Sequence, residues 1–196
     1  MAQGIYCFEG EWGPARDRRT VEPVLGLLRD CEGTPYVHRN VATRDALEFY
    51  AKKWRRLTSM PIGYFVCHGA RGQLWFGDEG VTIKEFAEIL GSRCEDKVLF
   101  FASCSTMAAK DQELIDLCQA TNARAVVGYT ETVDFVEAAA FEVLLLRDLL
   151  YTTNFKSAYT RMEREHPRMS RRLGLRMAHK TWASPRSIAQ EALDSA

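Results

Sequence analysis

A histidine and a cysteine each follow a short apolar run in this chain. Residues 62–67 lead into His68, and residues 98–103 lead into Cys104. About one helix's worth of sequence separates the runs, which predicts two parallel strands joined by a crossover helix. Because ligands bind at the carboxyl ends of parallel strands, we expect the imidazole and the thiol to face one crevice. A thiol beside a histidine is the minimum needed for nucleophilic acyl transfer.

The rest of the chain alternates apolar runs with helical patterns. Five strands are predicted, at residues 5–8, 36–41, 62–67, 98–102 and 123–129. Apolar residues three or four positions apart mark the helices between them and a long helix at 134–150. This alternation predicts an α/β fold with a doubly wound, mostly parallel sheet and helices on both faces. The strand order 2-1-3-4-5 places the histidine and cysteine strands side by side.

Composition indicates an ordinary globular protein. The 196 residues are 46% hydrophobic and 27% charged, with a formal net charge of zero. A neutral chain has no general attraction to nucleic acid or membranes. The first four residues carry no positive region or apolar stretch, and the aliphatic block at 143–146 is cut by Arg147 and Asp148. We therefore expect no secretory signal and no membrane partner.

Six cysteines support a cytoplasmic location. They lie at positions 7, 31, 67, 94, 104 and 118 and form no C-x-x-C pair. In the absence of a secretory signal, we expect them to be reduced thiols in a cytoplasmic protein. Their spacing does not fit a zinc site, so no metal is predicted.

The C-terminal part of the chain is basic. Residues 155–186 carry nine Lys or Arg against two acids. We expect residues 1–150 to form the α/β domain and residues 151–196 a helical basic C-terminal extension packed on it. Apart from weak contact through this extension, no nucleic-acid binding is expected.

Three stretches resemble one family. Residues 65–69, Phe-Val-Cys-His-Gly, look like the histidine block of the caspase–hemoglobinase fold of cysteine peptidases. Residues 98–104 look like its cysteine block. Residues 72–82, which include a predicted β-excursion at 72–80, are similar to the Leu-x-Leu-x-Asp-Gly-x-Leu-Thr segment of the CHAT branch, the caspase-like domains related to separase. The resemblance covers roughly residues 4–150, with the motifs in the family's order.

The resemblance implies a role for each motif residue. Cys104 would be the nucleophile, and His68 the general base that later protonates the leaving amine. The backbone N–H groups of Gly69 and Cys104 would form the oxyanion hole. We also expect Cys104 to lie just before a helix N-terminus, where the helix dipole favours a thiolate. No third, orienting residue is evident from the sequence.

Two acids are candidates for the substrate pocket. Asp134 follows the fifth strand, and an acid there would favour Arg or Lys before the scissile bond. Alternatively, Asp134 is simply the N-cap of the long helix. Asp78 lies in the turn of the β-excursion, and turn chemistry also explains it.

These observations favour a cytoplasmic caspase-like cysteine endopeptidase that cleaves protein substrates through a thioester acyl-enzyme and needs no cofactor. We expect a protein partner or homo-oligomerisation to activate it. One alternative is a catalytically inactive caspase-like interaction module within a larger effector system. Another is an unrelated flavodoxin-like domain that binds a small ligand or nucleic acid, although no Gly-rich nucleotide motif is present.

Overall fold

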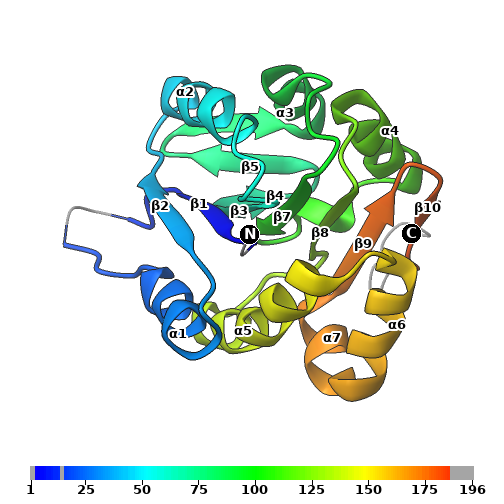
Figure 1. Ribbon diagram of the computed structural model, residues 1–196. Helices are drawn as coiled ribbons and strands as arrows, with labels where there is room; N and C mark the ends of the chain where they lie inside the picture. Colours follow the sequence, from blue (N-terminus) through cyan, green and yellow to red (C-terminus); the bar gives the residue numbers. More distant parts are fainter. Residues whose placement is uncertain (1–2, 14–15, 186–196) are drawn as a thin grey trace.

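A seven-stranded sheet forms the centre of the computed structural model, which describes residues 3–13 and 16–185 (Figure 1). Its strands are β1 (Ile5–Glu9), β2 (Tyr36–Asn40), β3 (Ile62–Val66), β7 (Val98–Ala102), β8 (Ala125–Tyr129), β9 (Leu175–His179) and β10 (Trp182–Ala183). The order across the sheet is β10-β9-β8-β7-β3-β1-β2. Five neighbouring strands of this sheet, β8, β7, β3, β1 and β2, are parallel. This confirms the predicted fold class and the order 2-1-3-4-5 of the first five strands.

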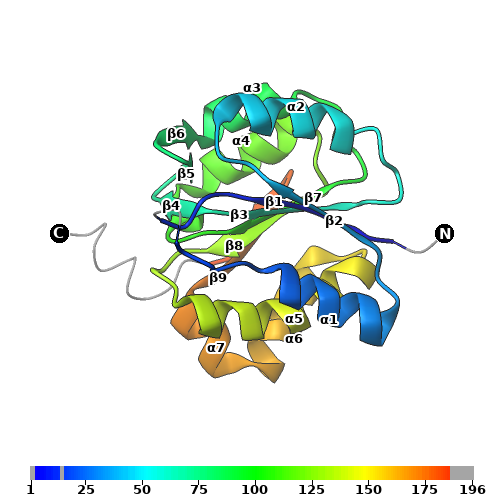
Figure 2. The ribbon, with the colours of Figure 1, turned by 90° about the vertical axis from the view of Figure 1, so that its left-hand side faces the viewer.

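Helices cover both faces of the sheet (Figure 2). They are α1 (Glu22–Glu32), α2 (Arg44–Trp54), α3 (Ile83–Leu90), α4 (Asp111–Thr121), α5 (Phe135–Tyr151), α6 (Phe155–Glu165) and α7 (Pro167–Leu173). One face carries α2, α3 and α4, and the other carries α1, α5, α6 and α7. No helix within the described ranges is long and apolar enough to cross a membrane.

The central strands divide their side chains between two cores. Along β7, Phe100 belongs to the core beneath α1 and α5, whereas Leu99 and Phe101 belong to the core beneath α2, α3 and α4. Successive side chains of a strand point to opposite faces, so a strand covered on both sides is apolar throughout. This explains why β3 and β7 appear in the sequence as uninterrupted apolar runs.

The predicted β-excursion is a second, three-stranded sheet. It consists of β4 (His68–Ala70), β5 (Gln73–Phe76) and β6 (Glu79–Thr82), all antiparallel. Thr82 then caps α3: its hydroxyl accepts the Glu85 N–H at 3.2 Å, and the Glu85 carboxylate accepts the Thr82 N–H at 2.9 Å. Because this small sheet starts at His68, it positions the segment directly after β3.

The C-terminal segment is only partly helical. Helices α6 and α7 match the prediction, but residues 175–183 form β9 and β10 instead of helix. The spacing of Leu173 and Met177 fits one helix face, yet Gly174 ends α7 in a left-handed conformation with φ 64°. The chain then reverses and β9 pairs antiparallel with β8. Residues 186–196, including Arg186 of the basic run, lie outside the described residues.

Arg176 is a buried member of the basic run. Its side chain extends from β9 and donates to the carbonyl oxygens of Met107 and Ala109, at 2.8 and 2.7 Å. It also forms an ion pair with Asp111. Carbonyl groups in a loop need donors when they are buried. Arg176 therefore fixes the segment that follows the cysteine strand.

Replacing Arg176 tests this role. We expect Arg176→Met to lower the free energy of unfolding by about 3 kcal/mol, because buried acceptors lose their donor. Arg172→Met is the matched control. It removes an exposed pair with Glu137, which is worth about 0–1 kcal/mol. Chemical denaturation measures both, and equal effects would contradict the structural role of Arg176.

Candidate active site

His68 and Cys104 line one cavity of about 120 Å³. Strands β3 and β7 are neighbours, with Val66 opposite Ala102 in a parallel register. Each strand continues by two residues, to His68 and Cys104, so both arrive at the same edge of the sheet. The His68 side chain is exposed and Cys104 is half-buried. The strand pairing therefore places both residues at one cavity.

Gly69 packs against the turn that carries Cys104. A Cβ atom at Gly69 would lie 2.5 Å from both the Cys104 carbonyl oxygen and the Thr106 Oγ1, and 2.9 Å from the Ser103 Cβ. Cβ atoms do not approach other atoms so closely, so only glycine fits this contact. The close approach places the Gly69 backbone beside Cys104, as an oxyanion hole built from the two residues requires.

The segment after Cys104 is not the predicted helix. A short 3₁₀ turn follows at Thr106–Ala108, and α4 begins only at Asp111. The helix dipole acts over about one turn, so it does not reach the thiol from there. The prediction of a helix N-terminus directly after Cys104 is therefore wrong. Instead, the Val133 N–H donates to the Cys104 Sγ at 3.5 Å.

The Trp12 carbonyl orients the imidazole of His68. The Nε2 atom of His68 lies 3.0 Å from this oxygen. The indole ring of Trp12 also contacts the imidazole edge-on, with the ring centroids 5.5 Å apart. A carbonyl oxygen only accepts hydrogen bonds, so the neutral ring holds its proton on Nε2. Nδ1 is then the nitrogen that can accept a proton. This partner could not be predicted from the sequence, because any residue can supply a backbone carbonyl.

A buried carboxylate fixes the position of Trp12. Glu9, at the end of β1, accepts hydrogen bonds from Trp12 Nε1 at 2.9 Å and from Val21 N at 2.9 Å. Its other oxygen accepts from Thr20 Oγ1 at 2.7 Å and lies 2.5 Å from His38 Nε2. These contacts tie both ends of the loop between β1 and α1 to one group. Trp12 is therefore held where its carbonyl meets His68.

The pKa values of Glu9 and His38 reflect this pairing. Burial acts to raise the pKa of Glu9, but the hydrogen bonds from His38, Trp12 and Thr20 outweigh it and lower the pKa. The hydrogen bond to Glu9 raises the pKa of His38, against a smaller opposing effect of burial. Both partners are therefore stabilised in their charged forms.

Glu142 is a second acid that the sequence analysis did not identify. It extends from α5 into the same cavity as Cys104, and the hydroxyls of Tyr64 and Tyr129 donate to its two oxygens. Burial raises the pKa of Glu142 to about 7, although the two tyrosine hydrogen bonds act to lower it. In the sequence, Glu142 is the single charged residue within an apolar helix pattern at residues 138–146. That position was the feature that could have marked it as a buried acid.

The two acids considered for the substrate pocket lie elsewhere. Asp134 is the N-cap of α5 and accepts the N–H groups of Val136 at 2.9 Å and Glu137 at 3.0 Å. Its side chain does not line the cavity, although Val133 and Phe135 do. Asp78 is exposed in the turn between β5 and β6, also away from the cavity.

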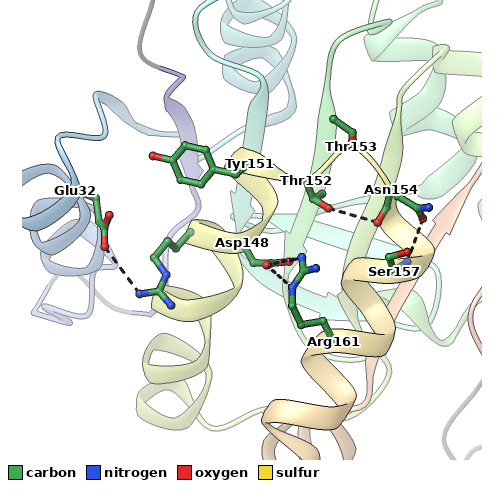
Figure 3. Close-up of a pocket in the computed structure, with 9 residues that line it drawn as sticks. Glu32, Asp148, Tyr151, Thr152, Thr153, Asn154, Ser157 and Arg161 are labelled. Carbon is green, nitrogen blue, oxygen red and sulfur yellow. Dashed lines mark hydrogen bonds and ion pairs between the residues drawn. The ribbon is translucent and has the colours of Figure 1, made fainter.

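A larger cavity of about 560 Å³ lies where α5 ends and α6 begins (Figure 3). Its charged groups are paired with each other: Arg161 binds Asp148 at 2.6 Å, and Arg147 lies 3.9 Å from Glu32. No cysteine or histidine lines it. Volume alone therefore does not identify the reactive site, and the smaller cavity at Cys104 is the better candidate.

Comparison with known proteins supports the fold. Residues 2–179 match a family described as "Family of unknown function (DUF6642)". No curated protein matches the chain significantly. A solved structure described as "structure of pro-sf-caspase-1" matches with a TM-score of 0.50 at 12% sequence identity, covering 84% of this chain and 80% of that chain. At this identity, the similarity shows a shared caspase-like fold.

The Glu9–His38 pair predicts a pH-dependent stability. The contribution of His38 is complete below its usual pKa of 6.5 and is lost as the pH rises through its raised value. The contribution of Glu9 is present above its usual pKa of 4.5 and is lost as the pH falls through its lowered value. The stability difference between wild type and His38→Gln should therefore be largest between about pH 4.5 and 6.5.

Urea denaturation at several pH values measures this difference. His179→Gln is the control, because His179 forms no ion pair within the described residues. A constant difference between wild type and His38→Gln from pH 5 to pH 9 would contradict the pairing.

The contact at Gly69 predicts a second stability effect. We expect Gly69→Ala to lower the free energy of unfolding by about 1–3 kcal/mol, because the new methyl group must displace the Cys104 turn. At Gly26, in α1, a Cβ would meet nothing within 4 Å. Gly26→Ala should instead raise stability by about 0.5–1 kcal/mol. A Gly69→Ala protein as stable as wild type in chemical denaturation would rule out the close approach.

Proposed function

The chain belongs to the DUF6642 family, whose function is unknown, and we propose that it is a caspase-like cysteine endopeptidase. One observation carries the proposal: Cys104 and His68 line the same cavity at the carboxyl ends of adjacent strands of a caspase-like fold. The motifs around these two residues, together with residues 72–82, extend the proposal to the CHAT branch of that fold.

The first half of the reaction forms a thioester. Nδ1 of His68 accepts the proton of the Cys104 thiol, because the Trp12 carbonyl holds the other ring nitrogen. The thiolate attacks the scissile carbonyl carbon, and the N–H groups of Gly69 and Cys104 stabilise the resulting oxyanion. The intermediate collapses as the C–N bond breaks, and His68 donates its proton to the leaving amine.

The second half returns the free enzyme. His68, now neutral, accepts a proton from water, and the hydroxide attacks the thioester carbonyl. The C–S bond breaks, the peptide acid leaves and Cys104 regains its proton from His68. No cofactor takes part in these steps. The cavity of about 120 Å³ has room for one side chain of a substrate, which is less than a peptide-binding groove needs. The proposal therefore includes a partner protein or a second copy of the chain that completes the groove.

Alkylation by iodoacetamide tests the activated thiol against an internal standard. Cys31 is exposed, whereas Cys104 is half-buried. Accessibility alone would therefore make Cys31 react first, but an activated Cys104 should react faster. Peptide mass mapping over time gives both rates in wild type and in His68→Ala. We expect His68→Ala to slow Cys104 by at least about tenfold and to leave Cys31 unchanged.

Cleavage of unfolded casein tests the complete reaction. Wild type should produce new peptides, and Cys104→Ser should produce none above background. His179→Gln serves as the control for loss of a histidine outside the cavity. If Cys104 reacts more slowly than Cys31 and His68→Ala leaves the rate of Cys104 unchanged, the catalytic proposal is wrong and the inactive interaction module is favoured. Intact casein beside a His68-dependent Cys104 would instead show that the groove needs its partner.

A further inference from the structure

A separate cavity lies between helices α3 and α4. These helices are neighbours on one face of the sheet (Figure 1), and the cavity is lined by both of them and by the turn that joins β4 to β5. Its volume of about 610 Å³ is within the range of small-molecule sites. It shares no lining residue with the cavity at Cys104. We call it the α3–α4 groove, and the function proposed above does not use it.

Apolar side chains form much of the lining of the α3–α4 groove. They are Ile83 and Ala87 of α3, Leu117 and Ala120 of α4, and Ala109 from the segment before α4. Ile83 and Leu117 are buried, whereas Ala87 is half-buried and Ala120 is exposed. Because alanine is short, the two helices leave apolar surface between them that a ligand can cover. Removing such surface from water is favourable.

Gly72 closes one end of the groove. Its N–H donates to the Thr106 carbonyl oxygen at 3.2 Å, and its carbonyl oxygen accepts the Ile83 N–H at 3.0 Å. These two bonds tie the start of α3 to the segment that precedes α4. A Cβ atom at Gly72 would lie 3.9 Å from the Ala109 Cβ and 4.0 Å from the Ile83 Cδ1. A groove that is blocked at one end by fixed main chain suits a compact ligand better than a long segment of a partner.

The closed end of the groove is positively charged. Arg71, Lys84 and Lys110 line the groove, and each is the chain neighbour of a residue that closes it. Both lysines are exposed, and neither forms an ion pair within residues 3–13 and 16–185. Their ammonium groups can therefore turn toward an anion at this end of the groove.

The two acids of the groove are hydrogen-bonded within α4. The Glu113 carboxylate accepts the Lys110 N–H at 2.7 Å, and the Asp116 carboxylate accepts the Gln112 side-chain amide at 2.7 Å. Both acids lie farther along α4 than Lys110, away from the end that Gly72 closes. The groove is therefore positive at one end and apolar along much of its length, which matches an anion with an apolar body.

We propose that the α3–α4 groove binds a small organic anion. Its carboxylate or sulfonate would lie between Lys84 and Lys110, and its apolar body would lie against Ala87 and Leu117. The lysines supply charge-assisted hydrogen bonds, and the apolar lining supplies most of the binding free energy. The site does not depend on the chemistry of Cys104, so its test is independent of the proposed peptidase.

The dye 8-anilinonaphthalene-1-sulfonate tests the site, because it combines an aromatic body with one sulfonate. We expect its fluorescence to rise on the folded protein and to saturate at one dye per chain. 1-Naphthylacetate should displace the dye at least about fivefold more tightly than 1-naphthylacetamide, which has a similar shape but no charge. Equal displacement by the acid and the amide would show that the lysines do not select an anion, and would overturn the proposal.

Substitutions locate the bound dye. Ala87→Phe places a ring in the groove and should weaken dye binding at least about tenfold. Ala139→Phe adds the same ring at a half-buried position of α5 outside the groove, and should leave binding unchanged. Replacing Lys84 and Lys110 together by glutamine should weaken binding of the acid about fivefold and leave the amide unaffected. Lys52→Gln removes an exposed lysine from α2, outside the groove, and is the charge control.

Two outcomes would contradict the assignment. Dye binding that persists in Ala87→Phe, in a protein whose circular dichroism matches wild type, would place the dye elsewhere. The double lysine variant changes only exposed side chains, so it tests the selection of an anion even if Ala87→Phe does not fold. An acetylated helical peptide of leucine and glutamate carries similar chemistry in a longer ligand. If this peptide displaces the dye more tightly than 1-naphthylacetate, the groove binds a protein segment and the assignment of a small anion is wrong.

Discussion

The parallel pairing of β3 with β7 is the constraint on which the candidate site depends. With Val66 opposite Ala102, the next residues of both strands emerge at one edge of the sheet. His68 and Cys104 then line one cavity, together with Trp12 from the loop after β1. A register shift of one residue would turn each side chain to the opposite face. The two apolar cores on either side of these strands fix the register, because every residue of β3 and β7 is buried.

Three buried polar side chains lie around the paired strands β3 and β7, and each contacts a different part of the site. Glu9 ties the loop after β1 and so places the Trp12 carbonyl on the imidazole. Arg176 holds the carbonyls of the segment after Cys104. Glu142 lines the same cavity and accepts hydrogen bonds from Tyr64 and Tyr129. Buried polar groups cost free energy unless they are satisfied. All three make hydrogen bonds to groups at or near the site, which is consistent with a site whose geometry is fixed before any substrate binds.

Apolar periodicity predicted the five parallel strands, and the family resemblance and the handedness rules gave their order. That order accounts for the position of His68 and Cys104 at one cavity. The sequence could not predict Trp12, since the group that contacts His68 is a backbone carbonyl. Residues 175–183 were expected to be helical because Leu173 and Met177 have helical spacing, but Gly174 breaks the helix and pairing with β8 decides the outcome. Glu142 was overlooked within an apolar helix pattern. Its importance depends on the tertiary contacts with Tyr64 and Tyr129, which local sequence does not encode.

Direct detection of the acyl-enzyme tests the central claim, that Cys104 is a nucleophile served by His68. The protein would be mixed with a panel of N-acylated amino-acid esters, quenched in acid and analysed by intact mass and peptide mapping. We predict an acyl group on Cys104 of wild type, none on Cys104→Ala and much slower accumulation on His68→Ala. An acyl group on the exposed Cys31, or the same accumulation with and without His68, would contradict it.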